Sequence, residues 1–226
     1  MTISPVSFAS DGLVQRVAAN LAEVRRRIVA TGRLLESVRI VAVTKTFGVD
    51  AVRAAAAVGL QTIGENYVDE LCEKRDATSD LDLRWHYLGA LQTNKIARIA
   101  HCADVLCGVS RQKELVKIAA ARPGAAIYVQ VDFTGIVGRN GAPPEDVESL
   151  VAAGRALDLD VRGLMTVAPV DPAAARRAFG ATSALCDELG LVERSMGMSE
   201  DLELACECAT TEVRLGRALF GPREAP

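Results

Sequence analysis

Short β-rich segments alternate with longer helical segments along this sequence, and this alternation constrains the fold more than any other feature. Eight strands are predicted, at residues 39–44, 61–63, 84–88, 104–107, 126–132, 160–165, 193–196 and 212–215. Helices are predicted at 11–30, 49–58, 66–76, 92–101, 110–121, 144–157, 172–189 and 199–208, with a short one from about 217. The alternation predicts an α/β fold of parallel strands joined by crossover helices, and eight strands favour closure into a TIM-type (β/α)8 barrel.

The alternative fold is a doubly wound open sheet, but the G-x-G-x-x-G motif expected after its first strand is missing. The 226 residues, half of them hydrophobic, are enough for one substantial core. No Pro/Gly/Ser-rich linker or low-complexity tract interrupts the series. We therefore expect a single domain over residues 1–226, with loose ends at 1–10 and 222–226.

The charge balance argues for a small-molecule partner. The formal net charge is −3, so the chain lacks the basic excess that attracts nucleic acid or an anionic membrane. No apolar run approaches the roughly 20 residues needed to cross a bilayer. We expect a soluble protein, and a monomer.

The cysteines predict neither a metal centre nor a secreted disulfide framework. They form no C-x-x-C pair, the two histidines are far from the closest cysteine pair, and no secretory signal pattern precedes them. We expect a reducing cytoplasm, no zinc site, and buried or idle thiols at Cys72, Cys102, Cys107, Cys186, Cys206 and Cys208.

Lys45 directly follows the first apolar strand, in R-I-V-A-V-T-K. In a β/α barrel the chemistry is built at the carboxyl ends of the strands, so this lysine is placed at the expected rim. Apolar surroundings would lower the pKa of its ammonium and supply the neutral amine that attacks a carbonyl. Taken alone, such a lysine is more often a cation with its stem on an apolar surface.

Other polar residues fall at comparable positions. Asn66 follows the second strand, His86 lies within the third, and Met165 ends the sixth. Parallel strands end at one edge of a barrel, so these residues are compatible with a shared pocket.

Two glycine-bearing junctions between a strand and a helix occur near the end of the chain. Ser199 belongs to the first, and Gly216 and Arg217 form the second. Backbone N–H groups at a helix start bind anions, and phosphates frequently bind at the loops after strands seven and eight of a barrel. Ser199 could equally be a helix cap, and Arg214 either a rim cation paired with Glu212 or a permanent charge facing a cofactor ring.

Six segments resemble the pyridoxal phosphate homeostasis protein family, also called YggS/PROSC-like PLP-binding proteins, where PLP is pyridoxal 5'-phosphate. They are V-A-V-T-K-T (41–46), G-E-N-Y (64–67), W-H-Y-L-G-A-L-Q-T-N-K (85–95), R-G-L-M (162–165), S-M-G-M-S-E-D (195–201) and V-R-L-G-R-A-L-F-G (213–221). The match runs in order through nearly all of the chain after residue 30. The W-H-Y-L-G and S-M-G-M-S segments together are highly specific.

The resemblance implies an alanine racemase N-terminal domain-like barrel, PLP fold type III, in which the lysine matching Lys45 forms a Schiff base with PLP. It also implies that Ser199, Gly216 and the main chain of Arg217 hold the phosphate and that Arg214 faces the pyridine nitrogen. Asn66, His86 and Met165 would be wall residues of the same pocket. The family's loop after the fifth strand carries an Asn-Glu-Lys-Gly pattern, and the loop at 131–141 departs from it with Ile136 and Arg139.

Three functions are compatible with these residues. The first, which the resemblance implies, is a non-enzymatic protein of vitamin B6 metabolism that stores, buffers or delivers PLP, with PLP-dependent apo-enzymes as recipients. The second is a PLP-dependent racemase or lyase with Lys45 as base, which requires a second acid or base, and Tyr67 and His86 are the candidates. The third is an aldolase-like barrel that uses Lys45 without a cofactor.

Overall fold

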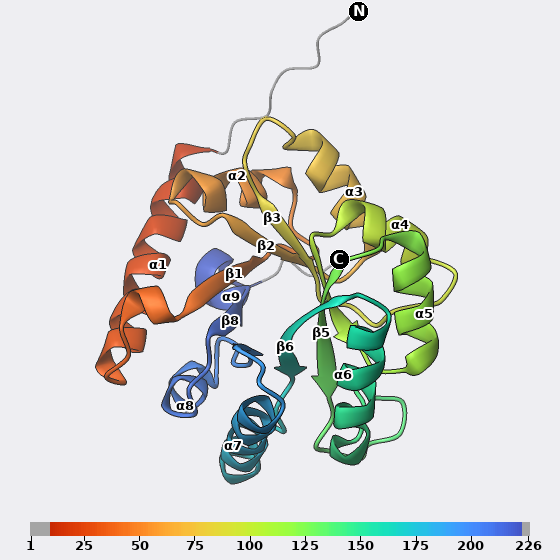
Figure 1. The fold of residues 1–226 in the computed structure, drawn as a ribbon. Helices are drawn as coiled ribbons and strands as arrows, with labels where there is room; N and C mark the ends of the chain where they lie inside the picture. Colours follow the sequence, from red (N-terminus) through yellow and green to blue (C-terminus); the bar gives the residue numbers. More distant parts are fainter. Residues whose placement is uncertain (1–9, 223–226) are drawn as a thin grey trace, which may run out of the picture.

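The protein is a closed barrel of eight parallel strands surrounded by helices, as the alternation predicts (Figure 1). A computed structural model describes residues 10–222, and most of the ends expected to be loose lie outside these residues. The strands are β1 (Arg39–Val43), β2 (Thr62–Glu65), β3 (Arg84–Tyr87), β4 (Val105–Val109), β5 (Ala126–Val131), β6 (Asp160–Thr166), β7 (Glu193–Ser195) and β8 (Glu212–Leu215).

The helices lie outside the barrel and fall close to their predicted places. They are α1 (Asp11–Ala30), α2 (Val49–Ala57), α3 (Val68–Ala77), α4 (Ile96–Cys102), α5 (Gln112–Ala121), α6 (Val147–Ala156), α7 (Pro172–Glu188), α8 (Leu202–Glu207) and α9 (Arg217–Phe220), with single 3-10 turns at Leu35–Ser37 and Pro144–Asp146. The largest differences are at helix starts, because α4, α6 and α8 begin three or four residues later than predicted. Residues 92–95 form turns before α4, and the backbone N–H of Met198 donates to the Asp201 carboxylate in a turn before α8.

The barrel closes because β1 pairs with both β2 and β8. Between β6 and β7 the strands approach so closely that a Cβ atom on Gly163 would lie 1.9 Å from the carbonyl oxygen of Glu193. A large apolar core fills the space between the strands and the outer helices. A smaller apolar cluster of Val105, Cys107, Ala126, Tyr128 and Met165, together with Leu88, lies inside the barrel.

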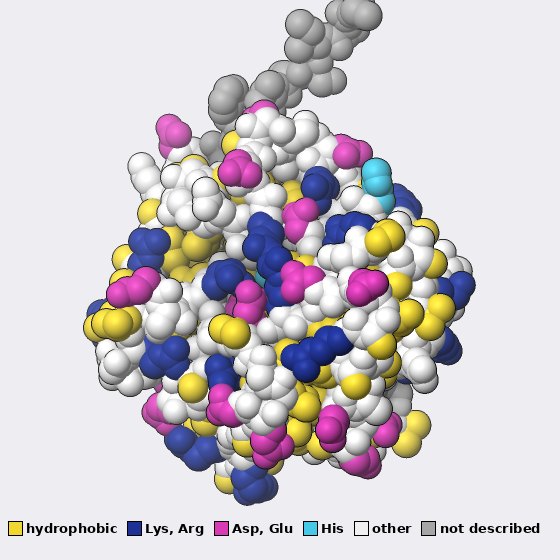
Figure 2. All heavy atoms as spheres, viewed as in Figure 1, with side chains coloured by type: hydrophobic (Ala, Val, Ile, Leu, Met, Phe, Trp, Pro, Cys, Tyr) yellow, Lys and Arg dark blue, Asp and Glu magenta, His cyan; other side chains and the backbone are white. Residues whose placement is uncertain are grey.

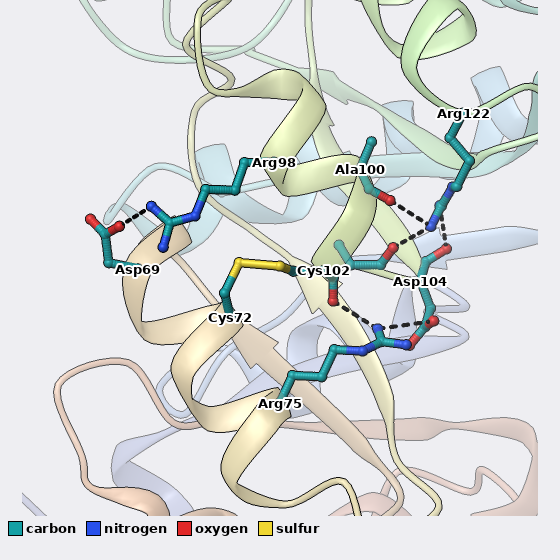
Figure 3. Close-up of a disulfide and its surroundings, with 9 residues drawn as sticks. Asp69, Cys72, Arg75, Arg98, Ala100, Cys102, Asp104 and Arg122 are labelled. Carbon is teal, nitrogen blue, oxygen red and sulfur yellow. Dashed lines mark hydrogen bonds and ion pairs between the residues drawn. A yellow bond between two sulfur atoms is a disulfide. The ribbon is translucent and has the colours of Figure 1, made fainter.

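A disulfide joins Cys72 of α3 to Cys102 at the end of α4 (Figure 3). The expectation that every cysteine is a thiol is therefore wrong for this pair. The two residues are 30 positions apart in sequence, but the packing of α3 against α4 brings their Cα atoms to 5.4 Å. The Arg75 guanidinium donates to the carbonyl of Cys102 over 2.7 Å and so ties the same helices together. The free thiols are buried at Cys107, Cys186 and Cys206 and half-buried at Cys208.

Charged side chains of both signs are interspersed over the face drawn in Figure 2, without an extended patch of one sign. Among residues 10–222, no helix is long and apolar enough to cross a membrane. Nor does this part of the chain gather three or more His, Cys, Asp or Glu side chains that could hold a metal ion.

Candidate functional site

A cavity of about 780 Å³ opens where the strands end, and seven of the eight predicted site residues line it. This volume is in the range of small-molecule pockets. The predicted residues on its wall are Lys45, Asn66, Met165, Ser199, Arg214, Gly216 and Arg217. The apolar part of the wall includes Val43, Leu88 and Val167, and the rim carries the acidic residues Glu200, Asp201, Glu203 and Glu207. Tertiary folding therefore brings five separate predicted segments to one pocket.

Lys45 is half-buried, and side chains of α3 hold the backbone on both sides of it. The buried Lys74 ammonium donates to the carbonyl of Thr44 over 2.8 Å, and the Glu70 carboxylate accepts the backbone N–H of Thr46 over 2.8 Å. Thr46 has a φ of 66°, which a non-glycine residue adopts at a cost. Because both neighbours are fixed, the lysine stem leaves the strand in a defined direction.

Arg214 is almost fully buried on the inner side of β8, and three oxygen atoms fix its guanidinium. Its Nη1 donates to the carbonyl and the hydroxyl of Ser195, over 2.5 and 2.8 Å, and its Nη2 donates to the carbonyl of Thr166 over 2.7 Å. Burial lowers the pKa of Arg214, and the nearby Glu212 carboxylate opposes that shift. A guanidinium has five N–H donors, so some remain for a group inside the cavity.

Ser199 lies beside the start of α9, where the last two loops meet. Its hydroxyl accepts the backbone N–H of Ala218 over 3.1 Å, which places it next to Gly216 and Arg217 although it precedes them by more than fifteen residues. A Cβ atom on Gly216 would lie 3.2 Å from the carbonyl oxygen of Val43, so glycine lets the start of α9 lie close to the end of β1. The Arg217 side chain is exposed and pairs with Glu200, which also lines the cavity.

His86 is the predicted residue that does not line the cavity. It is fully buried in the barrel interior, where its Nδ1 lies 3.5 Å from the Glu212 carboxylate and 3.8 Å from the Cys107 sulfur. Leu88, two residues further along and on the same inner side, reaches the cavity instead. The two-residue period of a strand indicated which side His86 faces, and the depth at which it lies depends on how the strands are staggered.

The loop at 131–141, which departs from the family pattern, borders the same end of the barrel. Arg139 donates to the carbonyls of Val167 and Ala168, over 2.8 and 3.2 Å, and both of these residues line the cavity. Ile136 and Val137 on the same loop are exposed. Arg139 thus fastens this loop to the segment after β6, while the hydrophobic side chains project outward.

The sequence matches known families over nearly its whole length. A family model described as alanine racemase, N-terminal domain, matches residues 14–224. The pyridoxal phosphate homeostasis protein of Pseudomonas aeruginosa is 37% identical over 223 residues, which cover 94% of this chain and 96% of that protein. The protein of the same name from Deinococcus radiodurans is 38% identical over 210 residues, which cover 90% of this chain and 99% of that protein.

Solved structures agree with these matches. PipY of Synechococcus elongatus, solved with PLP bound, superposes with a TM-score of 0.79 at 30% identity and covers 91% of this chain and 100% of that chain. An alanine racemase from Clostridium difficile superposes with a TM-score of 0.77 at 17% identity and covers 93% of this chain and 58% of that chain. At this low identity the racemase supports the fold alone.

Proposed function

This chain belongs to the pyridoxal phosphate homeostasis proteins, which are built on the alanine racemase N-terminal domain, and on that basis we propose that it binds PLP in the cavity at the strand ends and stores, buffers or delivers it inside the cell. Amino-acid and keto-acid metabolism would depend on it indirectly, through the supply of this cofactor. The observation that carries the proposal is the convergence of Lys45 and Arg214 on one cavity.

The lining residues fit the three chemical groups of PLP. The Lys45 amine is the attachment point for the aldehyde, because a primary amine and an aldehyde condense with loss of water. Ser199, Gly216 and the main chain of Arg217 are the proposed phosphate site. Arg214 is the proposed partner of the ring nitrogen, where a permanent cation keeps that nitrogen unprotonated and so limits the ring as an electron sink. Asn66 and Met165 are proposed wall residues.

Holding the cofactor, rather than turnover, is the function that the cavity favours. Racemisation needs an acid or base on each side of the substrate carbon, and Lys45 could serve only one side. The two candidates for the other side are Tyr67 and His86, and neither lines the cavity. We therefore propose a binding protein without a catalytic reaction, acting as a monomer and passing PLP to PLP-dependent apo-enzymes in the cytoplasm.

One experiment tests the cofactor, the linkage and the attachment site together. Purified protein incubated with PLP is expected to show a visible absorbance band, and borohydride reduction followed by peptide mapping is expected to label Lys45. The variant Lys45→Ala should lose the band. The matched control Lys113→Ala, which changes an exposed lysine on α5, should keep it. A wild-type protein that stays colourless after reconstitution would refute the proposal and favour the aldolase-like alternative.

Two further measurements separate the carrier from the enzyme. Incubation of the loaded protein with a panel of amino acids is expected to give no racemisation or decarboxylation beyond that of free PLP. Turnover well above that level would support the racemase or lyase alternative. Mixing the loaded protein with a PLP-dependent apo-enzyme should restore that enzyme's activity, and light scattering during size-exclusion chromatography tests the proposed monomer.

A further inference from the structure

Beneath Arg214 the barrel interior holds a charged group to which the proposed binding site gives no role. Glu212, two residues earlier on β8, has no exposed surface. One carboxylate oxygen accepts the Ser195 hydroxyl over 2.7 Å, and the other lies 3.2 Å from Nη1 of Arg39 and 3.5 Å from Nδ1 of His86. A buried carboxylate is costly unless it is paired, so this arrangement stabilises an anion at the centre of the barrel.

Ser195 connects this anion to Arg214 in a single direction. A serine hydroxyl has one hydrogen to donate and lone pairs that accept. Its hydrogen is directed to the Glu212 carboxylate, which can only accept while it is ionised, and its oxygen accepts from Nη1 of Arg214 over 2.8 Å. The chain of donors therefore runs from Arg214 through Ser195 to Glu212 and has no equivalent reversed form.

The charges agree with this direction. Burial would raise the pKa of Glu212, but His86, the Ser195 hydroxyl and Arg39 together lower it to about 2, so the carboxylate stays ionised. Burial lowers the pKa of Arg214, and among the surrounding groups the Glu212 carboxylate opposes that shift most strongly. Glu212 thus stabilises the Arg214 cation from the side away from the cavity.

The intervening serine has a physical consequence for the donors of Arg214. A carboxylate in direct contact would form a two-pronged ion pair with the guanidinium, which takes up two donors and neutralises the charge at short range. A hydroxyl between them takes one hydrogen bond and leaves the carboxylate further away. Arg214 therefore keeps both its positive charge and free N–H groups for the cavity.

We propose that Glu212, acting through Ser195, is a positioning residue that fixes the direction and the charge of Arg214 toward the ring nitrogen of a bound pyridine cofactor. The inference rests on the proposed function, because PLP is the group that Arg214 would face. The inference adds Ser195 and Glu212, which lie behind Arg214, to the residues that determine how the pyridine ring is bound. Neither Glu212 nor Ser195 lines the cavity, so neither would contact a cofactor bound there.

The test compares PLP-loaded wild type with Ser195→Ala, Glu212→Gln and Arg214→Ala. Loss of one hydrogen bond to a charged group is expected to weaken PLP affinity about tenfold in Ser195→Ala, measured by equilibrium dialysis. The wavelength of the visible absorbance maximum should shift toward that of Arg214→Ala. Adding Ser195→Ala to Arg214→Ala should cause little further change, because both substitutions interrupt one path.

The matched control is Tyr128→Phe. It removes a different buried hydroxyl, which donates to the Glu193 carboxylate, lies 3.3 Å from a Glu212 carboxylate oxygen, and does not lie on the path to Arg214. Thermal unfolding of the cofactor-free proteins identifies any variant that fails to fold. If Ser195→Ala fails to fold, Glu212→Gln, which keeps the side-chain volume, tests the same path from Glu212 to Arg214.

The outcomes separate the two proposals. If wild type and Tyr128→Phe bind PLP and folded Ser195→Ala and Glu212→Gln keep the wild-type band and affinity, the positioning role is refuted and PLP binding stands. Additive effects of Ser195→Ala and Arg214→Ala would also refute the positioning role. A wild-type protein that binds no PLP refutes both proposals together.

Discussion

Removal of the Cys72–Cys102 disulfide should destabilise the protein by a calculable amount. The bond closes a loop of 30 residues, and in the chain-entropy model such a link removes about 12 cal/mol/K from the unfolded chain. At 25 °C this corresponds to a stabilisation of about 3.6 kcal/mol. This is a large part of the stability of a typical single domain, so Cys72→Ser should be clearly measurable.

The assay is urea unfolding followed by far-UV circular dichroism, with and without a reducing agent. Cys72→Ser should lower the free energy of unfolding, and reductant should lower that of wild type by a similar amount. Reductant should have no effect on Cys72→Ser. The matched control is Cys208→Ser, which changes a half-buried free thiol and should retain most of the wild-type stability.

A loss of less than about 1 kcal/mol on reduction would refute this reasoning, because the loop-closure model predicts several times more. It would mean that the unfolded chain already keeps α3 and α4 together, or that the Arg75 contacts with Cys102 and Asp104 hold the helices without the bond. Differential alkylation of freshly lysed cells would measure the fraction of the protein that carries the Cys72–Cys102 disulfide in the cell. A reducing cytoplasm would keep that fraction low.

Three further predictions concern the barrel and its helices. Gly163→Ala should cost about 3 kcal/mol and lower the urea midpoint, because its Cβ would overlap the Glu193 carbonyl, and an unchanged midpoint would contradict the close strand contact. The pKa of Glu212 is about 2 in the folded protein and 4.5 without the surroundings of the fold. Its ionisation therefore contributes fully to the free energy of unfolding above pH 4.5, and this contribution is lost as the pH falls toward 2. Glu212→Gln should flatten the stability profile in that window, and an equally steep profile would contradict the shift. Asp171→Ala removes the side chain that caps α7 by accepting the backbone N–H of Ala174, and should cost about 1 kcal/mol in urea unfolding, which Asp171→Asn should largely restore.

The sequence predicts the barrel because its signals are local. In β5 every residue from Ala126 to Val131 is buried, as expected for a parallel strand covered by helices on one side and by the barrel interior on the other. The α1 helix begins where Ser10 accepts the backbone N–H of Leu13, a capping pattern that depends on neighbouring residues alone. The predicted boundaries differ from the structure where turns intervene, as at 92–95 before α4.

Most of the candidate site was also predictable, for a geometric reason. Parallel strands of a closed barrel end on the same side, so Lys45, Asn66 and Gly216 could be assigned to one edge before their distances were known. Inward orientation follows from alternation along each strand. The depth of a side chain within the barrel does not follow from this alternation, because it depends on the stagger between strands. This dependence explains why Leu88 rather than His86 reaches the cavity.

The sequence by itself determined the order of strands and helices, the place of Lys45 at a strand end and the two late junctions that meet around Ser199. Only the tertiary structure decided which residues meet across long separations. The Cys72–Cys102 bond depends on how α3 packs on α4, and the path from Arg214 through Ser195 to Glu212 depends on the register between β7 and β8. The physical reason is that local propensities act over a few neighbouring residues, whereas packing and register are fixed when the whole barrel closes.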